Sequence, residues 1–265
     1  MSEPKVLLEI DDRVATVTLN RPEALNALNS ELSEDLTRAI DEIKARAGDS
    51  VKAVVLTGAG RAFCSGGDIK SMNNEQRTPE AQRRRLRASH ARIQDVMHLE
   101  LPVVSLVHGA AAGAGANIAL AADFVIATPK AMFMQAFGRI GLVPDWGGMY
   151  VLPRLVGLQR AKELIFTARR VGAEEALKLG MVTEIVPEAG ALAHAQAFAR
   201  RFAAGSTTAI GLAKNILNQS HNLDLRQLLE LEASAQGICV ESDFHREAVR
   251  RFASKETPLY DWDSV

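Results

Sequence analysis

Alternating apolar and polar positions begin near the N-terminus. Residues 6–10 and 14–19 alternate on either side of a polar turn, which is the pattern of a β-hairpin. Apolar residues then recur at helical spacing and predict a helix over residues 30–46, with Ser30 as its N-cap. The β-branched run at residues 51–57 predicts a buried strand that leads into a glycine-rich loop.

The stretch from residue 101 to residue 148 has the most informative pattern. A β-branched run at 103–107 predicts a second buried strand, and a segment made only of Gly and Ala follows it at 109–116. A helical pattern and another apolar run come next, over 117–127. The stretch ends in Pro144-Asp145-Trp146-Gly147-Gly148, which places an acidic residue in a tight turn that opens another helix.

Each of these two strands therefore leads into a loop of small residues and then a helix. Such a turn leaves backbone N–H groups free at the start of the helix, and small side chains let an oxygen atom come close. The loop around Ala114 can hold a phosphate or a developing oxyanion, or it can simply allow close helix packing. In the earlier loop, the backbone N–H of Gly67 is a second candidate donor.

Strands and helices alternate as far as Pro187, and only helical patterns follow it. The change predicts a core over residues 1–190 and a helical region over residues 191–265. Repeated strand, turn and helix units indicate an α/β layered domain with its site at the strand ends. A long expected helix at 76–100 carries an arginine-rich run, which is typical of a solvated face or a contact between subunits.

The composition narrows the class of protein. The chain has 265 residues, of which 47% are hydrophobic, and a formal net charge of −1. This balance argues against nucleic acid or an anionic membrane as the main partner. Two cysteines imply no disulfide framework, and we find no metal-ligand pattern. Neither a signal-peptide pattern nor a long apolar run occurs, so we expect a soluble, cytoplasmic protein.

Three single residues have competing interpretations. Arg21 is either an exposed charge or a contact for an anionic group. Cys64 is a possible nucleophile, but the sequence offers no base beside it. His90 either lines a pocket or is an ordinary structural histidine on the long helix.

Three segments, taken together and in order, resemble the enoyl-CoA hydratase/isomerase (crotonase) family. They are residues 18–28, residues 62–70, and residues 104–124 with Gly113-Ala114-Gly115 at the centre. The resemblance extends over nearly the whole chain. It is more specific than a dinucleotide fingerprint, whose third glycine would fall at Ile118.

The resemblance implies a crotonase-like fold, in which ββα units form a superhelix followed by a C-terminal helical region. It also implies a homotrimer, or a hexamer made of two trimers. The ligand would be an acyl-CoA or enoyl-CoA thioester, so coenzyme A is part of the substrate and no separate cofactor is expected. The N–H groups of Gly67 and Ala114 match the oxyanion-hole positions of the family. The positions expected to bind coenzyme A are Arg21, Ala24, Leu25, Ala62, Ser65, Asp68 and Ile69.

The reaction depends on the groups around the acyl chain. Family hydratases carry two glutamates, and Asn117 and Phe137 occupy those positions here. Asp145 matches the catalytic aspartate of family isomerases, including the type that acts on epoxide-derived phenylacetyl-CoA. An Asp before a helix is also a common N-cap, so both roles stay open. The expected acyl pocket consists of Met72, His90, Asn117, Phe137, Leu142 and Trp146.

These residues predict an enzyme that shifts a double bond through an enolate, with Asp145 as its single acid and base. Enoyl-CoA hydration is the first alternative. A dehalogenase or thioester hydrolase in which Asp145 is the nucleophile, with help from His90, is the second. The third alternative is a coenzyme A thioester-binding protein without catalysis.

Overall fold

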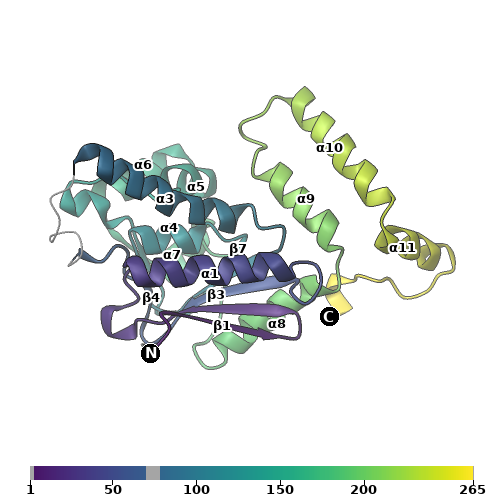
Figure 1. The fold of residues 1–265 in the computed structure, drawn as a ribbon, viewed down its shortest axis with the longest axis horizontal. Helices are drawn as coiled ribbons and strands as arrows, with labels where there is room; N and C mark the ends of the chain where they lie inside the picture. The colour runs from purple at the N-terminus through teal and green to yellow at the C-terminus, as the bar shows by residue number, and fades with distance from the viewer. Residues whose placement is uncertain (1–2, 70–77, 265) are drawn as a thin grey trace.

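A six-stranded sheet forms the centre of the computed structural model, which describes residues 3–69 and 78–264 (Figure 1). The strands lie in the order β1-β2-β3-β5-β7-β10, and all neighbours pair in parallel apart from the β1–β2 hairpin. Their bounds are Val6–Asp11 (β1), Val14–Leu19 (β2), Ala53–Gly58 (β3), Val103–Val107 (β5), Phe124–Ala127 (β7) and Glu184–Ile185 (β10). The predicted hairpin and buried strands are confirmed.

A second, four-stranded sheet contains short strands in the order β4-β6-β8-β9. They are Ala62–Cys64 (β4), Ala110–Ala112 (β6), Met132–Met134 (β8) and Arg170–Gly172 (β9). Each of β4, β6 and β8 follows a strand of the first sheet, and a helix comes after the pair. This recurring unit of two strands and a helix is the ββα repeat that we expected from the resemblance.

Helices cover both faces of the first sheet (Figure 1). On one face, α1 (Ser30–Arg46), α3 (Pro79–Met97) and α4 (Ala114–Leu120) bury the larger apolar core. On the other face, α8 (Ala191–Ala203) packs its alanines against the sheet in a second core. The site loops therefore extend from a scaffold that is packed on both sides.

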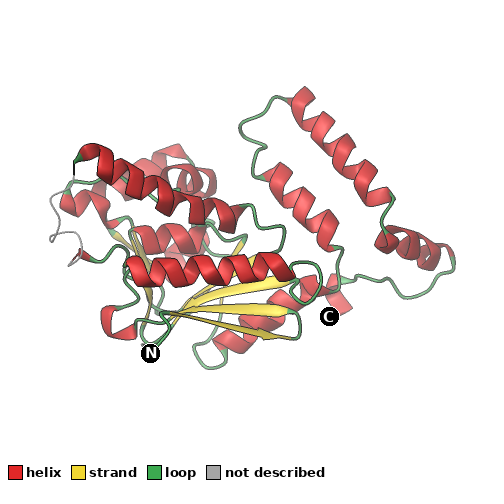
Figure 2. Cartoon of the chain, viewed as in Figure 1, coloured by secondary structure: helices red, strands yellow, loops and turns green. Residues whose placement is uncertain are grey.

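The remaining helices lie around this scaffold. They are α5 (Gly148–Val156), α6 (Leu158–Thr167), α7 (Ala173–Lys178) and the 3-10 turns η1 (Pro22–Ala24), η2 (Ala136–Ile140) and η3 (Trp262–Ser264). Beyond α8, the helices α9 (Thr207–Leu217), α10 (Leu225–Val240) and α11 (Asp243–Ala253) extend away from the sheets (Figure 2). In the expected range 191–265, α8 thus packs on the sheet, α9 leads away from it, and α10 and α11 project from the body. No helix in the described ranges is long and apolar enough to span a membrane.

An ion pair attaches α9 to the body. Lys214 Nζ lies 2.8 Å from Asp123 Oδ2 and donates a second hydrogen bond to the Leu101 carbonyl at 3.0 Å. The same Asp123 oxygen accepts the Val103 N–H at 2.8 Å. Since the side chains of Lys214 and Asp123 are only 7% and 22% exposed, the pair is largely enclosed.

The start of α1 differs from the prediction. Asn29, not Ser30, is the N-cap, and its side chain accepts the N–H of Leu32 at 2.9 Å. Ser30 is the first residue inside the helix. The predicted N-cap is shifted by one residue. Asn and Ser are about equally good N-caps, and here they are adjacent in the sequence.

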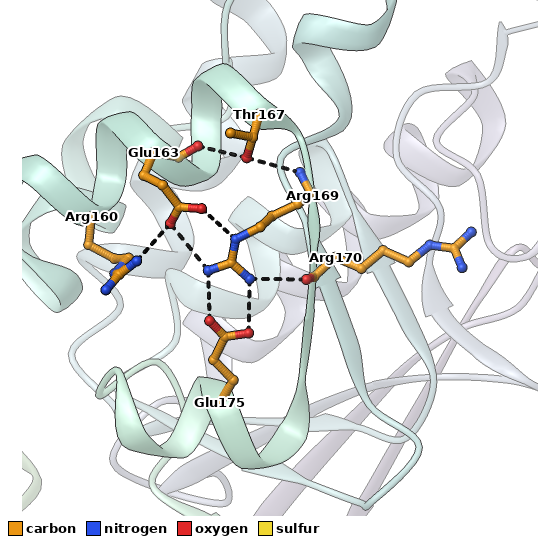
Figure 3. Close-up of polar contacts among 6 residues, drawn as sticks. All are labelled: Arg160, Glu163, Thr167, Arg169, Arg170 and Glu175. Carbon is orange, nitrogen blue, oxygen red and sulfur yellow. Dashed lines mark hydrogen bonds and ion pairs between the residues drawn. The ribbon is translucent and has the colours of Figure 1, made fainter.

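A charged cluster holds α6, β9 and α7 together (Figure 3). The guanidinium of Arg169 lies between Glu163 of α6 and Glu175 of α7, with Nη2 2.6 Å from Glu175 Oε1. Hydrogen bonds from Arg169 lower the pKa of both carboxyl groups. The adjacent Ala168 carbonyl accepts Arg139 Nε at 3.2 Å. The cluster therefore supports the corner on which η2 rests.

Candidate active site

A cleft of about 560 Å³ lies between helix α3, the two glycine-rich loops and the segment that leads from η2 into α5. Nine residues predicted for the site line it: Ser65, Gly67, Asp68, Ile69, Ala114, Phe137, Leu142, Asp145 and Trp146. The sequence places these residues in three separate segments, and the fold brings them to one cavity.

The two loops touch each other at the cleft. Gly66 has a φ of +97°, and a Cβ on it would lie 2.7 Å from the Ala112 carbonyl oxygen and 3.5 Å from the Ala114 nitrogen. This close approach requires glycine. Leu28 pairs with this loop: its N–H donates to the Gly66 carbonyl, and its own carbonyl accepts the Asp68 N–H. The N–H of Gly67, which lies between these two hydrogen bonds in the sequence, takes no part in the pairing.

Two unused donors result from this arrangement. Within the residues that the structure describes, neither the Gly67 N–H nor the Ala114 N–H makes a hydrogen bond, and both residues line the cleft. The Ala114 N–H has no partner in its helix because it belongs to the first residue of α4. Two such donors at one cavity can bind an oxygen that carries negative charge.

Asp145 lies in the turn before α5, and its carboxyl group is largely removed from water. Its Oδ1 is buried and has no hydrogen-bond partner among the described residues. Burial raises the pKa of Asp145, while the charges of His90 and Arg85 lower it by less. The N-cap of α5 is Gly147, so the alternative role of Asp145 as a helix cap is not what the structure shows.

Asn117 supports the turn that contains Asp145 through a hydrogen bond to its backbone. It was predicted to line the acyl pocket, but it is 1% exposed and is not among the residues that line the cleft. Its Nδ2 donates to the Asp145 carbonyl at 2.7 Å, and its Oδ1 accepts Gln135 Nε2 at 2.8 Å. A Cβ on Gly148 would lie 2.3 Å from Asn117 Nδ2. The amide therefore makes one hydrogen bond through its nitrogen and one through its oxygen, and it is tightly enclosed.

Three of the predicted pocket residues that line the cleft with Asp145 are apolar. Phe137 and Trp146 are buried and line the cleft, whereas Leu142 lies at its rim and is 50% exposed. His90 does not line the cleft, although its Nε2 is buried and has no partner in the described part of the chain. Met72 lies outside the described residues.

The expected coenzyme A positions separate into two groups. Ser65, Asp68 and Ile69 line the cleft, while Ala24, Leu25 and Ala62 do not. Arg21 is an ion-pair partner of Asp68 at 3.2 Å and also donates to the Ala27 carbonyl. Arg21 is therefore not a simple exposed charge, because it connects the η1 segment to the first loop.

The nucleophile interpretation of Cys64 does not fit the structure. Its Sγ is fully buried and lies 3.0 Å from the Asn26 carbonyl oxygen, which accepts its hydrogen bond. Burial raises the pKa of this thiol to about 12. The thiolate is therefore unavailable at neutral pH, and Cys64 packs against Gly115 to fix α4 on β4.

Sequence reasoning missed several residues of the site. Asn26 is buried and donates to the carbonyls of Ala59, Ala62 and Phe63, which fixes the first loop. Gln135 supports Asn117, and its Oε1 has no partner among the described residues. No local pattern marks such buried amides, because their partners come from distant segments. Among the described residues, no group of three or more His, Cys, Asp or Glu is placed to hold a metal ion.

Known proteins show the same organisation. The model of the enoyl-CoA hydratase/isomerase family matches residues 9–263. The chain belongs to the enoyl-CoA hydratase/isomerase family. A Rhodobacter capsulatus member, named "probable enoyl-CoA hydratase", is 42% identical over 98% of this chain and 99% of its own length. An Escherichia coli K12 member, 1,2-epoxyphenylacetyl-CoA isomerase, is 35% identical over 96% of this chain and 97% of its own length.

Solved structures confirm the crotonase fold. An enoyl-CoA hydratase/isomerase from Cupriavidus metallidurans CH34 matches with a TM-score of 0.92 and 34% identity, covering 98% of this chain and 97% of that one. Within the enoyl-CoA hydratase/isomerase family, relatives similar to this chain are named for both reactions. The distinction between them therefore depends on the residues of the cleft.

Proposed function

We propose that this enzyme shifts a double bond in an enoyl-CoA thioester through an enolate, with Asp145 as its single acid and base. The main support is a buried carboxyl group with an unpartnered oxygen, which lines the same cleft as two free N–H groups. A base and an electrophilic pair in one apolar cavity are what a proton transfer next to a thioester carbonyl requires.

The steps follow from these positions. The carboxylate of Asp145 removes a proton from the carbon next to the thioester carbonyl of a 3-enoyl group, and the electron pair moves onto the carbonyl oxygen. The Gly67 and Ala114 N–H groups stabilise this oxyanion; loss of one such donor typically costs about 3–4 kcal/mol. Asp145 then returns the proton to the γ carbon, and the carboxylate is regenerated.

Burial assists both halves of the transfer. The raised pKa of Asp145 makes the carboxylate a stronger base and brings its acid form closer to the working pH. Phe137 and Trp146 keep bulk water away from the carbanion. Hydration would need a group that activates water, and neither Asn117 nor Phe137 can accept a proton for that purpose.

The decisive experiment measures deuterium incorporation and identifies the products in the same reaction. Enoyl-CoA and acyl-CoA thioesters are incubated with the enzyme in deuterium oxide, and the products are analysed by mass spectrometry. Double-bond migration or deuterium incorporation supports the proposal. A 3-hydroxyacyl-CoA product would overturn it in favour of hydration. Binding without any change of mass, label or position would indicate a binding protein without catalysis.

A second candidate function uses Asp145 as a nucleophile. The observation that favours it is His90, whose Nε2 is buried without a partner and whose charge acts on Asp145. In this reaction the carboxylate attacks an acyl-CoA ring carbon and expels a halide, and water then hydrolyses the ester. The test is mass spectrometry of the protein for an aryl ester on Asp145 that still carries the coenzyme A thioester, together with halide release. Thioester hydrolysis would instead release free coenzyme A.

We also propose the coenzyme A and subunit arrangements that the resemblance implies. Ser65, Asp68 and Ile69, three of the positions expected to bind coenzyme A, line the cleft, which supports entry of coenzyme A beside the first loop. The projecting helices expose large apolar side chains, including Leu225 at 71% and Phe252 at 87%. A trimer or hexamer would cover them. Light scattering during size-exclusion chromatography measures the assembly directly, and a monomer would contradict this part of the proposal.

A further inference from the structure

A second cavity lies behind the cleft. It has a volume of about 30 Å³ and is enclosed by α1, α3 and the first sheet. Its walls are apolar side chains such as Leu36, Ile40, Val54 and Val96, apart from one arginine. An apolar cavity of this kind is unfavourable for water, since it offers too few hydrogen-bond partners.

Trp146 borders both spaces. It is among the residues that line the cleft and among those that line the cavity, and it is 5% exposed. Asp145, the group that we propose to move the proton, precedes it in sequence and lines the same cleft. We expect an acyl chain that extends past the reacting carbons to meet the ring of Trp146.

The backbone of Trp146 adopts a rare conformation. Its φ is +49°, a left-handed value that is uncommon for a bulky residue, and Gly147 follows it with a φ of +74°. Such a conformation persists only when the surroundings hold it, and it is often found at functional sites. Packing on both sides of the indole supplies that restraint.

Arg92 is the other residue shared by the two spaces. Its Nε donates to Thr37 Oγ1 of α1 at 2.7 Å, and its Nη1 donates to the Ala88 carbonyl at 3.4 Å. These bonds hold the guanidinium between α1 and α3. The partition between the cleft and the cavity thus consists of a fixed arginine and one aromatic ring.

We infer that Trp146 sets the maximum acyl length of the site. The ring closes the acyl pocket, and the apolar cavity behind it accepts further methylene groups only when the ring is made smaller. This inference depends on the proposed function to the extent that the ligand is an acyl-CoA thioester. It does not depend on the reaction, because saturated thioesters bind without turnover.

The test measures the affinity of saturated straight-chain acyl-CoA thioesters of increasing length by calorimetry. For the natural protein, affinity rises with chain length and then reaches a plateau. In Trp146→Leu the rise continues beyond that plateau, by about fourfold for each added methylene group, from about 0.8 kcal/mol per buried CH₂. Thermal melting verifies that each variant is folded before its affinities are compared.

Two variants of the cavity wall serve as controls. Ile40→Val enlarges the cavity alone, so it leaves the plateau of the natural protein unchanged because the ring is still in place. Val54→Ile narrows the cavity, so combining it with Trp146→Leu shortens the plateau relative to Trp146→Leu alone. A plateau at the same length in Trp146→Leu, or a narrowed cavity that has no effect on it, would overturn the inference.

Fluorescence provides a second readout on the natural ring. The chain has two tryptophans, and in Trp262→Phe the emission comes from Trp146 alone. We expect emission to change with chain length up to the plateau and then to stay constant, since longer chains no longer add contacts to the ring. Emission that responds to coenzyme A itself but not to acyl length would contradict the inference. Absence of binding by any thioester would instead count against the proposed function.

Discussion

Asp123 and Asp145 are two carboxyl groups that lose part of their solvation in different surroundings. Burial raises the pKa of both. Asp123 offsets that cost with Lys214 at 2.8 Å and with the Val103 N–H. Asp145 has a buried oxygen without a hydrogen-bond partner among the described residues, and the charges of His90 and Arg85 and a hydrogen bond from its own backbone lower its pKa by less than burial raises it.

The difference indicates what each carboxylate is for. A paired carboxylate is held in one protonation state and fixes two segments together, as Asp123 does for α9 and the sheet. A carboxylate without a close partner exchanges its proton easily, which is useful only where a ligand completes its contacts. The comparison predicts that substitutions at Asp123 mainly affect stability, and those at Asp145 mainly affect turnover.

Asp145→Asn has the largest expected effect on turnover. Turnover falls by about 10²–10⁴-fold, the usual contribution of a general acid–base group, while acyl-CoA binding is retained. Stability is unchanged or slightly higher, because the variant removes a buried ionisable group. Asp123→Asn is the matched control and shows the reverse, with lower stability and normal turnover in the folded fraction. Unchanged turnover in Asp145→Asn would exclude this carboxylate as the base.

Lys214→Met removes the ion pair between Lys214 and Asp123. It leaves Asp123 without its cation and lowers the free energy of unfolding by about 3 kcal/mol, at the low end for a buried pair because Asp123 keeps some solvent contact. Denaturant unfolding measures this change. The raised folded-state pKa of Asp123 makes its contribution most favourable at low pH, and that contribution is lost as pH rises. The loss in Lys214→Met is therefore larger at neutral pH than in acid, and an equal loss would contradict this account.

Asn117→Ala tests the support of the Asp145 turn. Removing the amide leaves the buried Asp145 carbonyl without its donor and costs about 1–3 kcal/mol of stability. Because the turn loses its fixed position, kcat falls about tenfold while KM changes little. Gln135→Ala is the control, since it keeps the Asn117–Asp145 hydrogen bond. If both variants reduce kcat equally, Asn117 has no specific positioning role.

The smallest effect concerns pH. Turnover rises with pH as Asp145 loses its proton, and the midpoint lies above 3.8, its ordinary value, because burial raises the pKa. His90→Gln removes a positive charge that lowers this pKa, so the midpoint moves to higher pH. The control is His98→Gln. His98 is the C-cap of α3, and its substitution leaves the pH profile of turnover unchanged. A shift to lower pH in His90→Gln would show that the electrostatic account is incorrect.

Local patterns predicted the framework of the molecule well. The strands 103–107 and 124–127 have the bounds that the sequence indicated, because each short apolar run is flanked by proline or polar residues that leave few alternatives. The convergence of Gly67, Ala114 and Asp145 came from the family resemblance, which carries tertiary information that periodicity lacks. The support of Asp145 by Asn117 and Gln135 was not predictable, because it depends on how distant segments pack. The same is true of the cavity behind Trp146.

The contact between Asn117 and Gly148 has a consequence for how this enzyme can change. The resemblance implies that hydratases of the family carry glutamates at positions 117 and 137, so we expect their chemistry to require two substitutions here. A longer side chain at 117 would press on the Gly148 backbone and displace Gln135, because the amide already fills its space. A substitution at position 117 would thus disturb the Asp145 turn unless the neighbouring residues changed with it. The packing around Asn117 therefore restricts which single substitutions this position accepts.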